Sequence, residues 1–111
     1  MSGLRVDTSS TDTRCWRTDH NVARLIRAAR EEAHDKHGDH SIESIPAYSI
    51  GTWLAVLMEE VGEVAHSLTY DADGPRLADE LLDVLAVAAA WLDALRLEGA
   101  YPRRPGGVWL A

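Results

Sequence analysis

Apolar residues recur every three or four positions along three separate segments of the chain. The first segment, residues 19–37, places five apolar side chains on one helical face: Val22, Leu25, Ile26, Ala29 and Ala33. Longer stripes with the same spacing run through residues 49–70 and 75–98. This spacing is typical of amphipathic helices. The pattern therefore predicts an all-α fold, made of a helical hairpin and an N-terminal helix.

Residues suited to helix ends flank the three segments. Gly38 and Gly99 follow the first and third segments, and glycine is favoured just after a helix C-terminus. Ser49 is the first residue of the second segment and suits the position of a helix cap, and Pro75 suits the first turn of the third segment. These residues predict where each helix starts or stops.

The turn between the second and third helices is short, so these two helices should pack as an antiparallel hairpin. The third helix is apolar beyond its main stripe, at Leu82, Ala86, Val87, Ala89 and Ala90. A helix that is apolar on two sides needs two packing partners. We therefore expect a homodimer or tetramer built as a four-helix bundle, with the alanines allowing close approach at the interface.

Composition narrows the classes of protein that fit. The chain has 111 residues and a formal net charge of −7, which argues against binding to nucleic acid polymers or anionic membranes. It contains one cysteine and no apolar run in residues 1–18, so a cytoplasmic protein without a signal peptide is expected. The expected organisation is a loose arm at 1–17, a helical domain at 18–99 and a flexible tail at 100–111.

Four acidic residues fall at matching heights on the predicted hairpin. With the turn centred between residues 71 and 72, Glu60 faces Asp83 and Glu63 faces Glu80. At about 100° per residue, all four lie on the same side of the hairpin. Converging carboxylates repel each other unless a cation is present, and oxygen ligands favour Mg²⁺, with Mn²⁺ as a substitute. The alternative is that they are solvated acids on amphipathic helices.

The arrangement E-E-x-x-E followed by E-x-x-D resembles the MazG-like, all-α nucleoside triphosphate pyrophosphohydrolases. Here it reads Glu59-Glu60-Val61-Gly62-Glu63 and then Glu80-Leu81-Leu82-Asp83. The resemblance implies a dimeric or tetrameric, Mg²⁺-dependent enzyme that splits a nucleotide between its α- and β-phosphates, giving a monophosphate and pyrophosphate. It also implies that Glu60, Glu63, Glu80 and Asp83 are the metal ligands.

The expected chemistry needs no covalent nucleophile, because bound Mg²⁺ can activate a water molecule and orient the phosphates. A carboxylate not fully used by the metal, Glu59 or Glu63, is the candidate to accept the proton of that water. Glu59 has two other readings. It can serve a second ion, or it can simply be solvated.

Candidate substrate-binding residues come from the helices and the linker between the first two. Trp53 and Trp91 should lie near one level of the hairpin, where a nucleobase can stack on them, or where both fill the core instead. His40 and Tyr48 can wall the same pocket. Lys36 is the only lysine of the chain and is a candidate phosphate contact.

Other functions remain open from the sequence. His34, His37 and His40 have a spacing that can hold a transition metal, although histidines are also favoured near a helix C-terminus. Glu63 and His66 form one E-x-x-H, the motif that di-metal oxidase bundles use twice. A third alternative is a non-catalytic helical interaction module whose acids bind a basic surface.

Overall fold

The computed structural model describes residues 20–71 and 74–100, and within these ranges every regular element is helical. The elements in chain order are α1 (Asn21–His37), η1 (Gly38–His40), η2 (Ile42–Ser44), α2 (Ile50–His66), η3 (Ser67–Asp71) and α3 (Gly74–Leu97). η1 and η2 are short 3₁₀ turns, and η3 is a π-helical turn that extends α2. The all-α prediction is confirmed, while the predicted arm at 1–17 and most of the tail lie outside the described residues.

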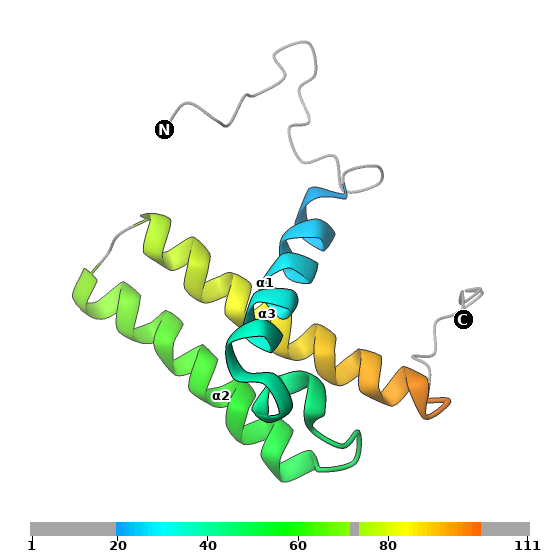
Figure 1. The fold of residues 1–111 in the computed structure, drawn as a ribbon. Coiled ribbons are helices and arrows are strands. Elements are labelled where there is room, and N and C mark those ends of the chain that lie inside the picture. The colour runs from blue at the N-terminus through cyan, green and yellow to red at the C-terminus, as the bar shows by residue number, and fades with distance from the viewer. Residues whose placement is uncertain (1–19, 72–73, 101–111) are drawn as a thin grey trace, which may run out of the picture.

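α2 and α3 form the predicted antiparallel hairpin, and α1 crosses over α3 (Figure 1). α1 also touches η1 and η2, but no Cα atom of α1 comes within 8 Å of one in α2. α1 therefore covers one side of the hairpin through α3 alone, which leaves space between α1 and α2.

The helix ends agree closely with the sequence. Gly38 and Gly99 have φ angles of 55° and 87°, which residues other than glycine rarely adopt. Both glycines therefore end their helices as predicted. α2 begins directly after Ser49, whose carbonyl accepts a 3.0 Å hydrogen bond from the Trp53 amide. The Ser49 side chain itself makes no capping bond.

The core is small and centres on Trp53, which is fully buried. Val87 and Ala90 of α3 pack with it, and Ile42 and Ile45 of the linker close over this cluster. The Trp53 indole N–H donates a 2.9 Å hydrogen bond to the Pro46 carbonyl. The linker is therefore held onto the hairpin by both apolar packing and a polar contact.

α3 is rotated relative to the expectation from its main apolar stripe. Ala86 and Ala90 were expected at an interface between chains, yet they are buried within the chain, at 5% and 2% exposure. Leu81, Leu85 and Leu92, which belong to the main apolar stripe of this helix, are instead 39–50% exposed. The small alanines allow the close packing within the chain, and the leucines are turned outward.

Exposed apolar residues of both long helices form one surface, which we call the outer apolar face. It consists of Leu54, Met58 and Val61 of α2 and Leu68 of η3, together with Leu81, Leu85 and Leu92 of α3. On each helix these residues lie about 100° from the face toward the other helix, in the same rotational sense, so both stripes lie on the side of the hairpin away from α1. None of the described helices combines the length and apolarity needed to cross a membrane.

Candidate metal centre

Three of the four predicted acidic ligands converge in the structure. Glu60 of α2 and Glu80 and Asp83 of α3 each offer a carboxylate oxygen, and these oxygens all lie within 4.8 Å of one another. Glu63 is exposed and is not part of this group. We call Glu60, Glu80 and Asp83 the acidic cluster.

The spacing of the acidic cluster suits a small, hard cation. Two oxygens bound to an octahedral Mg²⁺ lie about 3 Å apart when adjacent and about 4.2 Å apart when opposite, for bonds of about 2.1 Å. Oxygens within 4.8 Å need only small side-chain movements to reach these distances. All three donors are carboxylates, which favours Mg²⁺ or Mn²⁺ over softer metals.

The surroundings of the cluster disfavour its negative charge. Burial, followed by the charges of Asp83, Glu59, Glu80 and Glu63, raises the pKa of the Glu60 carboxyl. A bound cation would offset both effects by supplying the opposite charge.

The pKa of the Asp83 carboxyl is also raised. Burial raises the pKa of its carboxyl, and the charges of Glu80, Asp79 and Glu32 add to the effect. Glu32 belongs to α1, so the cluster is influenced by all three helices. Asp79 lies one helical turn before Asp83, so its position near Asp83 could be predicted from the sequence. No local feature of the sequence indicated that Glu32 lies near Asp83.

Arg76 provides a positive charge near the acidic cluster, which the sequence pattern did not indicate. The Nε atom of Arg76 lies 4.0 Å from a carboxylate oxygen of Glu80, one turn further along α3. This is a long, partly exposed contact, with the Arg76 side chain 56% exposed. Such a pair is weak and does not offset the negative charge of three carboxylates.

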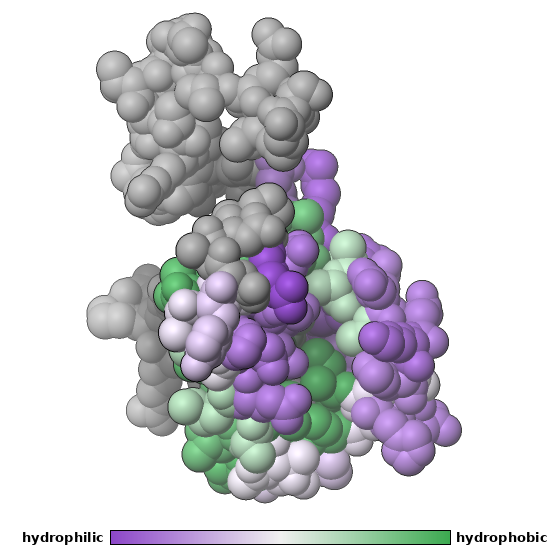
Figure 2. Space-filling view, turned by 90° about the vertical axis from the view of Figure 1, so that its left-hand side faces the viewer, coloured by the Kyte–Doolittle hydropathy of each residue, from purple (hydrophilic) through white to green (hydrophobic). Residues whose placement is uncertain are grey.

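A groove of about 950 Å³ opens beside the acidic cluster. Its walls come from α1 and α2 and its floor from α3, because α1 and α2 do not approach each other. Seen from the end where α2 and α3 join, apolar atoms are visible in a recess between two largely hydrophilic surfaces (Figure 2). The floor includes Leu82, Ala86 and Val87, with Asp83 beside them.

Several of the predicted site residues line the groove. Glu59, Lys36 and His40 all line it, together with Glu60 and Asp83. The charge of Glu59 is also one of those that raise the pKa of Glu60, so Glu59 lies near the cluster. Tyr48 does not line the groove and is 62% exposed, so the structure does not bring it to this site.

Trp53 cannot stack on a nucleobase in this structure. It is fully buried, and its ring stacks on that of Trp91 with centroids 5.9 Å apart and planes 1° apart. The expectation that Trp53 binds the base is therefore wrong, and its alternative role in the core is confirmed. Trp91 is partly buried and occupied by the same stack.

The alternative metal sites gain no support. Within the described residues, the acidic cluster is the only group of three or more His, Cys, Asp or Glu side chains that converge as metal ligands would. His34 instead shares a 3.0 Å hydrogen bond with the Ser41 hydroxyl. His66 packs against Tyr70, with ring centroids 4.7 Å apart.

Comparison of the chain with models of known protein families, with curated proteins and with solved structures found no match.

Proposed function

We propose that the protein is a Mg²⁺-dependent nucleotide pyrophosphohydrolase. It would cleave a nucleoside or deoxynucleoside triphosphate, or a related nucleotide, between the α- and β-phosphates, to a monophosphate and pyrophosphate. The observation that carries the proposal is the convergence of Glu60, Glu80 and Asp83 within 4.8 Å, next to a groove of about 950 Å³. The resemblance of the acidic motif to the MazG-like enzymes supplies the reaction.

The residues of the cluster fit the proposed ion. Glu60, Glu80 and Asp83 would hold Mg²⁺, and Glu63, one turn from Glu60, would join them after a side-chain rotation. When bound, the metal supplies positive charge for the phosphates and lowers the pKa of a coordinated water. Glu59 lines the groove beside Glu60 and would accept a proton from a water in that space.

The groove also offers surfaces for the rest of a nucleotide. Lys36 and His40 line it and can provide positive charge or hydrogen bonds for phosphate oxygens. Val56 and Leu82, which are half-buried, provide apolar surface for the base in place of the buried Trp53. A groove with apolar walls and a few polar groups is the usual form of a small-molecule site.

A panel of nucleotides incubated with Mg²⁺ tests the proposal, with separate assays for pyrophosphate and orthophosphate. We expect pyrophosphate as the direct product, and its loss on chelation of the metal. Glu60→Gln should abolish this activity, whereas Glu98→Gln, which changes an exposed acid at the far end of the hairpin, should retain it. Orthophosphate as the direct product would contradict the proposed bond cleavage.

We also propose that two copies pack through the outer apolar face to form a four-helix bundle. The described part of one chain has only four buried apolar residues, yet both long helices expose a continuous apolar stripe. A small domain with so little core gains stability by burying such a surface against another copy. The groove lies on the opposite side of the hairpin and would stay open in this assembly.

A non-catalytic interaction module is the second candidate, and the outer apolar face favours it. An exposed apolar surface of this kind is typical of sites that bind another protein. In that case, Glu60→Gln and Asp83→Asn would leave Mg²⁺ binding and function unchanged. The two substitutions therefore separate the two candidates.

A further inference from the structure

The attachment of α1 to the rest of the molecule is unusual for a helix that walls a candidate site. None of the residues of α1 is buried. α1 packs on α3 and on the linker turns η1 and η2, but not on α2. Yet Glu32, Lys36 and several alanines of α1 form one wall of the groove. Apolar packing alone therefore gives this wall little support.

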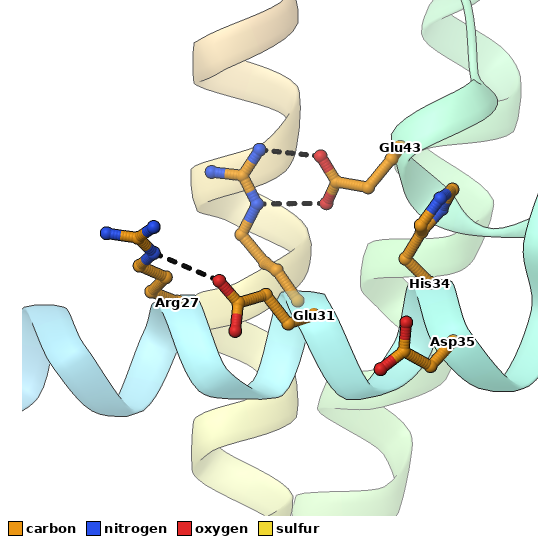
Figure 3. Close-up of a pocket in the computed structure, with 6 residues that line it drawn as sticks. Arg27, Glu31, His34, Asp35 and Glu43 are labelled. Carbon is orange, nitrogen blue, oxygen red and sulfur yellow. Dashed lines mark hydrogen bonds and ion pairs between the residues drawn. The ribbon is translucent and has the colours of Figure 1, made fainter.

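A set of ion pairs on the other side of α1 supplies a second attachment, and we call Arg30, Glu43 and Asp93 the Arg30 hub. Arg30 Nη2 and Nε donate hydrogen bonds of 2.6 Å and 2.9 Å to the two carboxylate oxygens of Glu43, in the linker turn η2. Arg30 Nη2 also donates a 3.1 Å bond to Asp93 of α3. The paired bonds to Glu43 are visible beside α1 in Figure 3.

The geometry of the hub gives it more strength than an ordinary surface pair. The Arg30 side chain is 23% exposed, and its planar guanidinium holds Glu43 in a two-pronged contact. The hydrogen bonds that Arg30 donates to Glu43 raise the pKa of Arg30 above its usual value, so Arg30 stays charged. Arg96 contributes a second cation to Asp93, with an Nη2–Oδ1 distance of 2.9 Å.

Another arginine of the same helix provides a natural comparison. Arg27 donates a 3.0 Å hydrogen bond to Glu31 one turn further along α1. Both side chains of that pair are largely exposed, at 83% and 64%, and both belong to α1. The Arg27–Glu31 pair, also drawn in Figure 3, therefore cannot attach α1 to anything else.

We propose that Arg30 is a positioning residue, which holds α1 over α3 and so sets the width of the groove beside the acidic cluster. The contacts of Arg30 with Glu43 and Asp93 attach α1 whatever the protein binds, and only the consequence for nucleotide binding rests on the proposed function. Without the hub, α1 would keep its own helical bonds but lose its main polar attachment, and a detached helix of 17 residues is marginally stable in water.

Hydrogen exchange followed by mass spectrometry tests the attachment directly. In Arg30→Gln, we expect the amides of α1 to exchange at least about tenfold faster than in the unchanged protein, with those of α2 and α3 altered by less than about twofold. Arg27→Gln is the matched control and should leave exchange in α1 within about twofold. Arg30→Lys keeps the charge without the two-pronged contact and should give an intermediate rate.

Two exchange results would overturn the proposal. One is equal exchange of α1 in Arg30→Gln and Arg27→Gln, because the hub would then not hold the helix. The other is a similar rise in all three helices, because Arg30 would then stabilise the whole fold. Glu43→Gln, which removes a charge but keeps the side-chain length, is a milder variant should Arg30→Gln fail to fold, and the same two results apply to it.

Steady-state kinetics test the consequence for the groove. In Arg30→Gln we expect KM for the nucleotide to rise about tenfold while kcat changes by less than about threefold, since the acidic cluster on α2 and α3 is untouched. An unchanged KM with a loosened α1 would overturn the positioning role. If the unchanged protein hydrolyses no nucleotide, the proposed function fails, and hydrogen exchange still decides whether Arg30 holds α1.

Discussion

Trp53 and Trp91 stack across the hairpin with ring planes 1° apart and centroids 5.9 Å apart. This offset stacking joins the first half of α2 to the second half of α3. Trp53 is fully buried and donates to the Pro46 carbonyl, whereas the Trp91 Nε1 has no hydrogen-bond partner among the described residues. Trp53 therefore connects α2, α3 and the linker in one place.

Trp53→Ala should destabilise the fold by about 3–5 kcal/mol, because it removes a fully buried indole and leaves a cavity. Urea unfolding followed by circular dichroism measures this change. Tyr48→Ala, at a position 62% exposed, should change the free energy of unfolding by no more than about 0.5 kcal/mol. Equal stability of the two variants would place Trp53 outside the core.

Removing one carboxylate of the acidic cluster should weaken Mg²⁺ binding. We expect Glu60→Gln and Asp83→Asn each to reduce the affinity at least tenfold, or about 1.4 kcal/mol, because each loses one anionic ligand. Isothermal titration calorimetry with MgCl₂ measures the affinity, and Glu98→Gln serves as the control. Unaltered affinity in both cluster variants would show that the ion binds elsewhere.

Mg²⁺ affinity should also depend on pH in a defined direction. Burial and neighbouring carboxylates raise the pKa of Glu60 and Asp83 above the ordinary values of 4.5 and 3.8. Protons compete with the metal for these groups, so affinity should be full above the raised pKa values and fall as pH drops through them. Calorimetry across pH 3–8 checks this. A decline in affinity that occurs only below the ordinary pKa values of the two carboxyls would contradict it.

The same two groups should influence the stability of the metal-free protein. A carboxyl with a raised pKa in the folded state destabilises that state when ionised, so the penalty is complete above the raised pKa and absent below the ordinary one. In EDTA, the unfolding temperature of Glu60→Gln should therefore exceed that of the unchanged protein at pH 7. The difference should shrink as the pH falls below the raised value. A larger difference at pH 4 would reverse the sign and exclude this explanation.

The proposed bundle predicts that a charge on the outer apolar face will separate the copies. Leu85→Glu places a carboxylate on that face and should convert an associated protein to a monomer, because an unpaired charge would be buried in the interface. Leu97→Glu, at a residue 72% exposed on another side of α3, should leave the association intact. Analytical ultracentrifugation at micromolar concentration measures both, and a monomeric unchanged protein would remove the basis for the bundle.

Ser67 is 1% exposed, and its hydroxyl has no hydrogen-bond partner among the described residues. Burying an unsatisfied hydroxyl costs stability, so Ser67→Ala should raise the free energy of unfolding by about 1 kcal/mol. Ser44→Ala, at an exposed position, should have little effect. A clear loss of stability in Ser67→Ala would instead reveal a polar partner for this hydroxyl.

The sequence itself determined where the helices lie along the chain and which acidic residues face each other across the hairpin. Helical periodicity, Gly38, Ser49 and Gly99 are local signals, because a helix depends on residues within a few positions of one another. A short turn between two helices also forces them to be antiparallel, which brought Glu60 opposite Asp83. These features could therefore be predicted without knowing how distant segments pack.

The position of α1 and the rotation of α3 were decided only by the tertiary structure. α3 is apolar on two sides, so its pattern alone could not tell that Ala86 and Ala90 pack inward while Leu85 is exposed. That choice depends on which side the linker and α1 cover, through contacts such as Arg30 with Asp93, 63 positions apart. Contacts at this separation depend on the packing of whole helices, which local periodicity does not encode.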